Sequence, residues 1–452
     1  MEKKTYERPI IKSLNYGITN KFGKKTEYTP VTQIDGVAIK DLIKDFGSPV
    51  FIYSERKIRE NIRNAKRIFE TRYPKVQFSW SYKTNYLNAI CKIYHQEGSW
   101  AEVVSIFEYE KAILNGVPGN KIIFNGPDKT NSDLMTAIKN DSLIHIDHLD
   151  ELYRLIEIAK ETKIRPRVAI RVNMDTGVYP MWDRFGFNYE NGQAWDAINK
   201  ILASDKLELT GLHCHIGTFM TSVNTYKVAA TKMADLAISI KNKHNKQIKY
   251  IDLGGGFASK NTLKGSFYSG IDASPDISEY AEVICSTLLN SGFPIDDLPY
   301  LYLETGRALI DDCGYLLGSV ISNKRLSDGR RATIIDVGVN ILFTAFWYDH
   351  KISLTQEFGH HTEDTVLYGP LCMNIDVIRE NITLPPLNAG DNFVVQHVGA
   401  YNVTQSMQFI TTRPAVVLID TNGKTNVIKL KESTENIMRE EQTPEHLKKI
   451  SL

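Results

Sequence analysis

Apolar and polar residues alternate one by one along residues 76–83. Successive side chains of a strand point to opposite faces, so this alternation predicts a β-strand with one apolar and one polar face. Lys83 ends the run on the polar side. A lysine in this place is most often solvated, but a sheltered one has an easily perturbed amine that can form a Schiff base with a carbonyl group. Lys83 is therefore the first candidate for chemistry.

Short strand-like runs alternate with amphipathic helical runs between residues 76 and 307. Eight such strands in about 230 residues are typical of a (β/α)8 barrel, whose catalytic groups lie at the carboxyl ends of the strands. A doubly wound open sheet is the alternative. The predicted strands are Phe78–Lys83, Trp100–Val104, Lys121–Phe124, Leu143–Asp147, Arg167–Asn173, Leu209–Ile216, Tyr250–Gly254 and Tyr300–Glu304. The predicted helices are Tyr86–Gln96, Phe107–Asn115, Ser132–Asn140, Leu149–Glu161, Ala194–Ala203, Tyr226–Lys243 and Ser278–Leu289.

The pattern changes after residue 307, where short β-rich segments follow one another without a long helix between them. This change predicts a β-sandwich or β-barrel. We therefore expect a barrel domain at residues 46–308 and a C-terminal β domain at residues 309–452, with residues 1–45 joining the β domain. The β-rich segments are Gly314–Ser319, Thr333–Val337, Asn392–Gln396 and Ala415–Ile419.

Composition narrows the class of protein. Of the 452 residues, 42% are apolar and 24% are charged, which is the balance of a folded globular protein. A net charge of +1 gives no electrostatic case for binding nucleic acid or an anionic membrane. The start of the chain lacks the apolar core of a signal peptide, and the five cysteines are scattered without a CxxC pair. We expect a cytoplasmic protein without a disulfide framework.

Two glycine-containing motifs follow the seventh and eighth predicted strands. Asp252–Phe257 contains three consecutive glycines, which let the backbone wrap closely around an anion and turn its amides toward a phosphate. The same segment could instead be a plain tight turn. In Glu304–Arg307, a carboxylate at a barrel mouth could hold a protonated pyridine nitrogen. Alternatively, Glu304 and Arg307 could form an ordinary ion pair.

Two histidines end the sixth predicted strand. His213 and His215 lie on one face of Gly211–Thr218, a spacing that could bind a metal ion. No third ligand is evident near them in the sequence, so we expect no metal site and prefer an imidazole stacked on an aromatic cofactor. Thr218 could reach a phosphate group.

Taken together, motifs between about Gly47 and Ile419 resemble those of the fold-type III pyridoxal-phosphate decarboxylases. The resemblance is strongest to the diaminopimelate decarboxylase branch, and ornithine decarboxylases are more distant. Several motifs in the right order are far more specific than any one of them. The matching segments are Pro49–Tyr53, Tyr82–Asn85, Ala101–Ser105, His213–Gly217, Gly254–Gly256, Glu304–Arg307, Gly369–Cys372 and Gly399–Tyr401.

The resemblance implies pyridoxal phosphate as the cofactor and a role for each motif. Lys83 would form the Schiff base, His215 would stack on the cofactor ring, and Glu304 would pair with the pyridine nitrogen. A lone cysteine is most often a buried apolar residue, but here Cys372 would protonate the carbanion at Cα after carbon dioxide leaves. It would come from the partner subunit of a homodimer with shared sites. The residues at or beside the phosphate would be Gly254, Gly255, Gly256, Gly306, Arg307 and Tyr401.

The positions that would read the distal end of the substrate depart from the diaminopimelate decarboxylase pattern. Those enzymes usually carry glutamate where Met373 stands and arginine where Thr344 stands. Arg307 and Tyr348 are retained as substrate contacts, and Asp376 stands where ornithine-type enzymes place an acid for a distal amine. Losing one charge-assisted contact costs about 1.5–3 kcal/mol, enough to reject a substrate. We therefore expect decarboxylation of an amino acid other than meso-diaminopimelate.

Two other functions fit the same scaffold. Racemases of this kind use a tyrosine base and an arginine at the pyridine nitrogen, so Glu304 and Cys372 argue against one. A catalytically silent regulatory homologue would have no reason to keep Lys83, the glycine loop and the carboxylate together. The sequence therefore favours an amino-acid decarboxylase.

Overall fold

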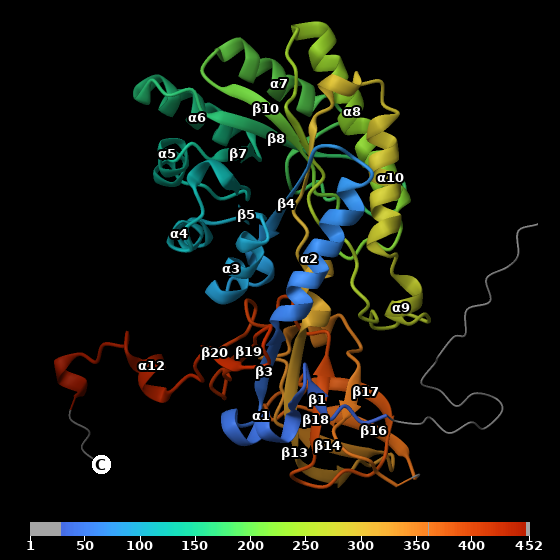
Figure 1. Ribbon diagram of the computed structural model, residues 1–452. Coiled ribbons are helices and arrows are strands. Elements are labelled where there is room, and N and C mark those ends of the chain that lie inside the picture. Colours follow the sequence, from blue (N-terminus) through green and yellow to red (C-terminus); the bar gives the residue numbers. More distant parts are fainter. Residues whose placement is uncertain (1–28, 360, 449–452) are drawn as a thin grey trace, which may run out of the picture.

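Eight parallel strands form a closed barrel in the computed structural model, which describes residues 29–359 and 361–448 (Figure 1). Each strand pairs in parallel with its neighbours, and β10 pairs with β8 to close the ring. The fold class and all eight predicted strands are confirmed. The barrel strands are β4 (Val76–Ser81), β5 (Trp100–Val103), β6 (Ile122–Phe124), β7 (Leu143–Ile146), β8 (Arg167–Asn173), β10 (Glu208–His213), β11 (Tyr250–Asp252) and β12 (Tyr300–Leu303), and β9 (Phe187–Asn188) extends β8.

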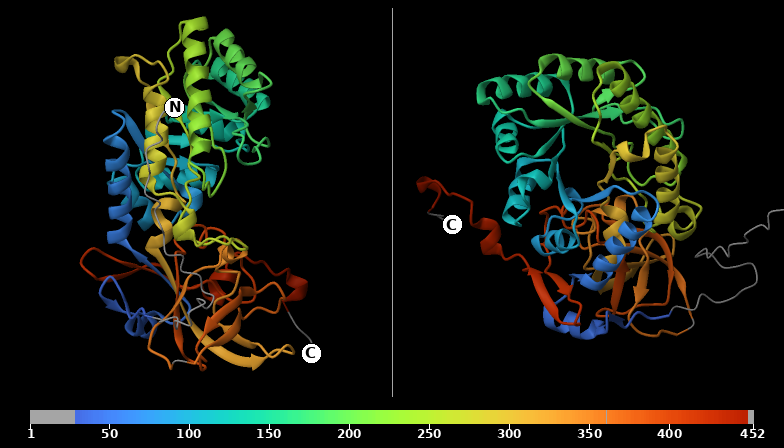
Figure 2. Two further views of the ribbon diagram at one scale, coloured as in Figure 1. Left: turned by 90° about the vertical axis from the view of Figure 1, so that its right-hand side faces the viewer. Right: turned by 45° about the horizontal axis from the view of Figure 1, so that its top comes forward.

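Helices surround the barrel strands, as the tilted view in Figure 2 shows. The seven predicted helices are present with ends shifted by a few residues. Three more were not predicted: the long α2 (Glu55–Glu70), which buries one face through Ile58, Ile62, Ala65 and Phe69, and two of only four residues each. The others around the barrel are α3 (Asn88–Gln96), α4 (Ile106–Leu114), α5 (Asn131–Lys139), α6 (Leu149–Thr162), α7 (Gln193–Ser204), α8 (Asn224–His244), α9 (Gly270–Ala273), α10 (Ile277–Leu289) and α11 (Arg307–Ile310).

A second, mixed sheet builds the β-rich domain below the barrel in Figure 1. Its strands run in the order β17-β16-β14-β13-β3-β19-β20, and β18 pairs with β13 and β15. Strand β3 belongs to this sheet, although we had assigned residues 46–308 to the barrel. The strands are β3 (Val50–Ser54), β13 (Gly314–Arg325), β14 (Arg331–Ile335), β15 (Ile352–Leu354), β16 (Glu363–Tyr368), β17 (Val377–Leu384), β18 (Asn392–Gln396), β19 (Val416–Ile419) and β20 (Thr425–Lys429).

The described part of the first 45 residues packs on the same sheet. A short hairpin leads into α1, and Ile34, Ile39 and Leu42 are buried against Ile52 and Leu317. Residues 1–28 lie outside the described part of the chain. The remaining elements are β1 (Gln33–Ile34), β2 (Val37–Ala38), α1 (Ile39–Phe46), α12 (Thr434–Met438) and the short 3-10 helices η1 (Tyr82–Thr84), η2 (Gly119–Lys121), η3 (Ile295–Asp297), η4 (Asp311–Cys313), η5 (Phe343–Phe346) and η6 (Glu445–Leu447).

The carboxyl ends of the barrel strands face the β-rich domain. Just after β4, the Asn85 side chain donates to the Tyr53 hydroxyl (2.9 Å) and to the Gly399 carbonyl (3.2 Å). These bonds draw the chain out of the barrel, so β4 ends at Ser81 and Lys83 lies in η1, two residues beyond the strand rather than at its end as predicted. One continuous hydrophobic core runs through both domains. No helix among the described residues is long and apolar enough to cross a membrane.

Candidate active site

Lys83 is held beside a buried carboxylate at the mouth of the barrel. Its Nζ lies 2.7 Å from Oε2 of Glu102, which also accepts a hydrogen bond from Ser81 Oγ at 2.5 Å. Glu102 is fully buried, whereas 37% of the Lys83 side chain is exposed. Burial works to lower the pKa of Lys83, but the carboxylates of Glu102 and Glu304 outweigh it and hold that pKa above its ordinary value. The amine is therefore charged at neutral pH.

A single amide connects this carboxylate to the one that follows β12. Asn125, just after β6, donates to Oε1 of Glu102 (3.0 Å) and to Oε1 of Glu304 (2.6 Å). Asn125 and Glu304 are both 4% exposed. Lys83, Glu102, Asn125 and Glu304 thus form one continuous polar chain across the barrel mouth.

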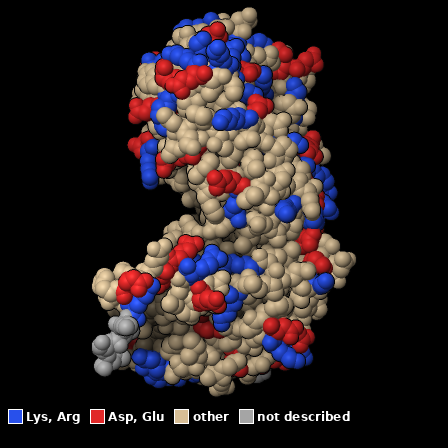
Figure 3. All heavy atoms as spheres, turned by 90° about the vertical axis from the view of Figure 1, so that its left-hand side faces the viewer, with Lys and Arg blue, Asp and Glu red and all other residues tan. Residues whose placement is uncertain are grey.

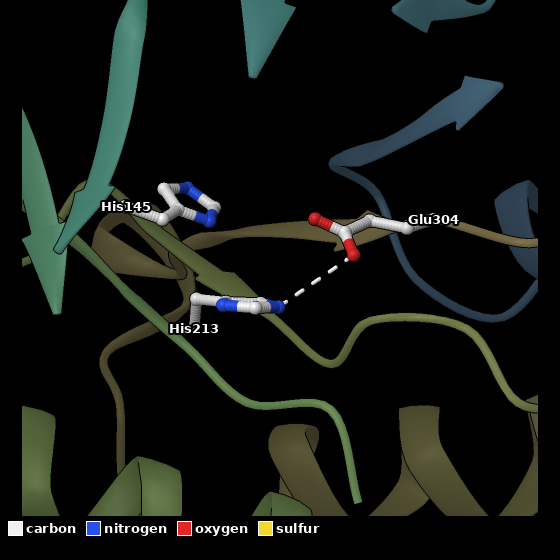
Figure 4. A group of neighbouring side chains, drawn as sticks. All are labelled: His145, His213 and Glu304. Carbon is white, nitrogen blue, oxygen red and sulfur yellow. Dashed lines mark ion pairs between the residues drawn. The ribbon is translucent and has the colours of Figure 1, made fainter. Parts of the chain in front are cut away.

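Glu304 also faces two histidines from the interior of the barrel (Figure 4). The Nε2 atom of His213 lies 3.5 Å from Oε2 of Glu304, and the rings of His213 and His145 are 4.6 Å apart. The His145 Nε2 atom lies 3.0 Å from the Tyr250 hydroxyl. Burial is the main cause that lowers the pKa of both histidines well below its usual range. Both rings are therefore neutral.

The sequence shows no third metal ligand near His213 and His215. The fold, however, brings His145 and Glu304 beside His213. One ligand atom each from His145, His213 and Glu304 lies within 4.8 Å of the others. The fold brings them together because β7, β10 and β12 converge on the barrel axis, which the chain order does not reveal. Two imidazoles and a carboxylate are donors that zinc accepts, while a lone carboxylate in such a place suits a protonated ring nitrogen.

His215 and the glycine loop lie next to each other. The Gly255 amide donates to Nδ1 of His215 at 3.2 Å, and the Trp182 ring lies 5.6 Å from the imidazole. Burial, together with the charges of Arg171 and Lys83, lowers the pKa of His215 to about 3. The ring is therefore neutral at physiological pH.

The three consecutive glycines are required by close backbone approach. Gly254 has φ +66°, and a Cβ there would lie 2.7 Å from the Cys214 carbonyl oxygen. At Gly255 a Cβ would lie 2.5 Å from the Glu304 carbonyl oxygen, and at Gly256 2.3 Å from that of Gly217. Any side chain would therefore push apart the ends of three neighbouring strands. The loop is therefore a tight junction, and the Gly254 amide donates to Oδ1 of Asp252 at 2.8 Å.

Arg307 lies against aromatic rings where the two domains meet. Its guanidinium carbon lies 4.6 Å from the ring centre of Tyr401 and 5.3 Å from that of Tyr348. The Nη1 atom is buried and has no hydrogen-bond partner among the described residues. Beside it, a Cβ on Gly306 would lie 2.0 Å from Thr84 Oγ1, and the Tyr401 amide donates to the Thr84 carbonyl at 2.8 Å. This nitrogen forms an ion pair with Oδ2 of Asp311 at 4.0 Å, too long for a hydrogen bond, so its N–H groups could still donate to an anionic ligand.

Several predicted site residues lie apart from this group. Thr218 is exposed beyond β10, and Cys372 is exposed on the loop between β16 and β17, with Met373 half-buried next to it. None of the contacts recorded among residues 29–359 and 361–448 links Cys372 to Lys83. Within one chain, the structure therefore does not bring the predicted acid to the lysine.

Two residues that we expect to contact the substrate, Thr344 and Asp376, form hydrogen bonds within the β-rich domain. The hydroxyl of Thr344, 1% exposed, donates to Asn402 Oδ1 (2.8 Å) and lies 2.8 Å from His350 Nε2. The carboxylate of Asp376, 2% exposed, accepts the amides of Val339 (2.8 Å) and Leu371 (2.7 Å). In this structure both side chains are buried and bond to neighbouring loops of their own chain, and their role as substrate contacts stays a prediction.

Sequence reasoning gave no role to Glu102, Asn125 or His145. A signal was present, because each is a polar residue at or beside the carboxyl end of a short apolar barrel strand. That is where barrel enzymes place their catalytic groups. From the sequence, Glu102 is a candidate only as part of the Ala101–Ser105 motif, and Asn125 and His145 are not candidates at all.

The mouth of the barrel holds a lysine, two buried carboxylates and a glycine loop. Such a site can bind a cofactor that carries an aldehyde or ketone group. The chain belongs to the pyridoxal-dependent decarboxylases, because residues 55–311 match the family model of their pyridoxal-binding domain. Diaminopimelate decarboxylase from Methanocaldococcus jannaschii is 29% identical over 92% of this chain and 95% of that protein, and the Bacillus subtilis enzyme is 28% identical over 90% and 94%.

The fold of a solved relative agrees. A crystal structure of the M. jannaschii diaminopimelate decarboxylase superposes with a TM-score of 0.84 at 28% identity, covering 92% of this chain and 96% of that one. The predictions of a pyridoxal-phosphate cofactor and of amino-acid decarboxylation are confirmed. The residues present fit this cofactor: an amine, a carboxylate, a neutral imidazole, a loop of three glycines and an arginine nitrogen without a hydrogen bond among the described residues lie at one mouth.

Proposed function

We propose that this enzyme decarboxylates an amino acid other than meso-diaminopimelate, using Lys83, His215 and Glu304 around the cofactor. When bound, pyridoxal phosphate supplies the electron sink that the loss of carbon dioxide requires. Lys83 would hold its carbonyl carbon, His215 would lie flat on the ring, and Glu304 would face the ring nitrogen. The glycine loop, Gly306, Arg307, Tyr401 and the exposed Thr218 are the candidates for the phosphate.

The contacts of Lys83 indicate how it would become reactive. A charged amine cannot attack a carbonyl, so its proton must leave first. Oε2 of Glu102, 2.7 Å from Nζ, is placed to receive that proton. Glu304 accepts a hydrogen bond from Asn125 at 2.6 Å and lies 3.5 Å from Nε2 of His213, and these contacts would hold its carboxyl group toward the ring nitrogen. We infer from this arrangement that Glu304 serves the cofactor and not a metal ion.

We further infer that the working enzyme is a homodimer in which Cys372 of each subunit completes the site of the other. One observation supports this: Cys372 is exposed on its loop and so is open to a partner. A thiol on the partner's loop would deliver a proton to Cα. A hollow between the barrel and the β-rich domain offers the partner a way in (Figure 3).

Mixing two inactive variants tests the shared site. Lys83→Ala and Cys372→Ala are each expected to abolish activity. After the two are unfolded and refolded together, random pairing makes half of the dimers mixed, and each mixed dimer carries one intact site, so about a quarter of the sites recover. No recovery above the level of the separate variants would contradict a shared site, whereas recovery in dimers would support it.

The proposal on substrate rests chiefly on the distal positions. Met373 stands where the resemblance leads us to expect a glutamate, and Thr344 stands where it leads us to expect an arginine. The Thr344 hydroxyl is bonded to Asn402 and is 1% exposed, so it does not replace a guanidinium as a carboxylate ligand. Without that pair, a distal ammonium and a distal carboxylate would both be left without a charged partner.

The deciding experiment is carbon dioxide release by the pure, cofactor-loaded enzyme. The panel contains meso-diaminopimelate, lysine, ornithine, arginine and glutamate derivatives, and Lys83→Ala serves as the blank. We expect turnover of a member other than meso-diaminopimelate. Strong turnover of meso-diaminopimelate above all others would overturn the substrate proposal while leaving the decarboxylase in place.

A further inference from the structure

A buried carboxylate outside the expected site motifs lies beside Arg307. Oδ2 of Asp311 accepts hydrogen bonds from the Ser259 hydroxyl (2.5 Å) and the Asn261 side-chain amide (2.9 Å), and Oδ1 accepts the Ala400 backbone amide (3.2 Å). The Asp311 side chain is 2% exposed. Donors from the loop after β11 and from the turn after β18 therefore fix both oxygens of this carboxylate.

Asp311 forms the one ion pair that Arg307 makes among the described residues. Its Oδ2 atom lies 4.0 Å from Nη1 of Arg307, which stands four residues earlier in the chain. Burial raises the pKa of Asp311 to about 6, although the charge of Arg307 and the three hydrogen-bond donors oppose this rise. The carboxyl group is therefore ionised at neutral pH. Both side chains are buried, so water screens the two charges poorly.

Arg307 lies close to the segment that carries Lys83. Gly306 packs against the side chain of Thr84, the residue after Lys83. Tyr401, whose ring centre is 4.6 Å from the guanidinium carbon, donates its backbone amide to the Thr84 carbonyl at 2.8 Å. An amino acid held at Lys83 would therefore bring a long side chain near this guanidinium, whose Nη1 atom has no hydrogen-bond partner among the described residues.

Asp311 changes what this nitrogen can bind. A carboxylate that accepted the free N–H would lie beside a positive charge, but also near the negative charge of Asp311, 4.0 Å from the same nitrogen. The repulsion would offset much of the attraction, because both act through the same poorly screened interior. A distal end without a carboxylate would not meet this repulsion, so the pair discriminates between the two kinds of ligand.

We propose that Asp311 is a specificity-determining residue that compensates the charge of Arg307 and so selects against substrates with a distal carboxylate. The inference rests on the proposed function and narrows its substrate class to amino acids whose distal end is uncharged or cationic. The residues at positions 373 and 344 would only fail to attract a charged distal group. Asp311 adds a repulsion that acts on any distal carboxylate.

The test compares L-lysine with meso-diaminopimelate, which carries one more carboxylate at the distal end. Each is titrated into the cofactor-loaded enzyme at about pH 8, above the pKa of Asp311. The initial change in the visible absorption of the cofactor gives each dissociation constant. The variants are Asp311→Asn and Asp311→Ser, which lack the charge but can still accept hydrogen bonds, and the second remains informative if the first does not fold.

Asp336→Asn is the matched control. The Asp336 carboxylate likewise accepts a hydroxyl, from Ser48 (2.5 Å), and a backbone amide, from Ser319 (2.7 Å). Burial raises its pKa too, but no charged partner contributes to that shift. This variant therefore removes a carboxylate that holds two segments together without removing the partner of an arginine.

In the wild type we expect meso-diaminopimelate to bind more weakly than lysine. Both Asp311 variants should lower the ratio of the two dissociation constants by at least about tenfold, because the repulsion acts on meso-diaminopimelate alone. Loosened packing would weaken both ligands alike and leave this ratio in place, so the ratio separates an effect of charge from an effect of structure. Asp336→Asn should keep the wild-type ratio.

A ratio that stays at its wild-type value in both Asp311 variants would overturn the inference. Titration of the cofactor-free proteins with pyridoxal phosphate and with pyridoxal then shows whether Arg307 serves the phosphate instead. Failure of the proposed function is distinguishable. Wild-type enzyme that decarboxylates meso-diaminopimelate best would contradict the substrate proposal, and the ratio in the variants would still report whether Asp311 repels the distal carboxylate.

Discussion

The carboxylate of Asp376 closes the loop that carries Cys372, and its replacement should cost stability before it costs specificity. Asp376 accepts the amide of Leu371 from its own loop and the amide of Val339 from the segment between β14 and η5. A Cβ on Gly369 would lie 2.2 Å from the carboxylate, so the chain is packed tightly around it. Asp376→Leu removes both acceptors at similar size. Asp376→Asn replaces one acceptor with a donor that faces a backbone N–H.

The magnitude follows from the two amides. A buried donor that loses its acceptor costs about 1–3 kcal/mol. Asp376→Asn should therefore lower the free energy of unfolding by about 1–3 kcal/mol, and Asp376→Leu by about 2–6 kcal/mol. The control is Asp364→Asn on the neighbouring strand β16, where the carboxylate is exposed and bonds only to Thr383 at 3.3 Å. Such a surface change stays within about 0.5 kcal/mol.

The assay measures the urea midpoint of the cofactor-loaded protein together with kcat and KM for two substrates, one with a distal amine and one without. A structural role predicts a lower midpoint and equal kinetic effects on both substrates. If the midpoint of Asp376→Asn equals that of wild type and KM rises only for the substrate with the distal amine, the reasoning is refuted. Asp376 would then read the substrate.

Two further results follow from the charges around the site. In cofactor-free protein at pH 8, Glu102→Gln should lower the pKa of Lys83 toward its ordinary range and raise its rate of acylation, read by peptide mass spectrometry, by at least about tenfold. An unchanged rate, as expected for the control Glu110→Gln at an exposed position, would contradict the pairing. Burial raises the pKa of Glu108 from 4.5 to about 7, although the hydrogen bond from the Val104 amide opposes it. Between these two pH values the folded state holds a proton that the unfolded state has lost. The free energy of unfolding therefore falls as the pH rises from about 4.5 to about 7. Glu108→Gln should flatten this part of the urea midpoint profile between pH 5 and 8, and an unaltered profile would exclude Glu108 as its source.

The barrel could be predicted because each of its strands and helices carries a local pattern. Apolar runs as short as Ile122–Phe124 were found because they recur between amphipathic helices at regular spacing. The β-rich domain was only partly predictable. Strands such as β16 and β17 have mixed burial, and no helices separate them. Strand β3 directly precedes α2, so its sequence suggests a first barrel strand although it belongs to the other sheet.

The site residues that have a local sequence pattern could be predicted, and those without one could not. Lys83, His215, the glycine loop and Glu304 stand in recognisable motifs at strand ends, and the convergence of barrel strands predicts that they meet. Asn125 carries no motif, and its role depends on facing two carboxylates from other strands. For Thr344 and Asp376, the sequence does not indicate burial, and only the structure reveals the hydrogen-bond partners of their polar atoms.

The position of β3 in the sheet determines how long this strand stays unpaired while the chain is being synthesised. This strand lies between β13 and β19 in the finished sheet, yet it leaves the ribosome before the barrel does. At about 5–20 residues per second, the interval from Ser54 to Val416 is roughly 20–70 s. Strand β13 begins about 100 residues before β19, so β3, which is buried along its whole length in the finished fold, lacks both neighbours until β13 appears and lacks β19 for the full interval. The barrel has all of its own strands within a continuous stretch of chain. Nascent chains halted just after the barrel should therefore expose β3 to chaperones, and its release should coincide with the appearance of the last strands.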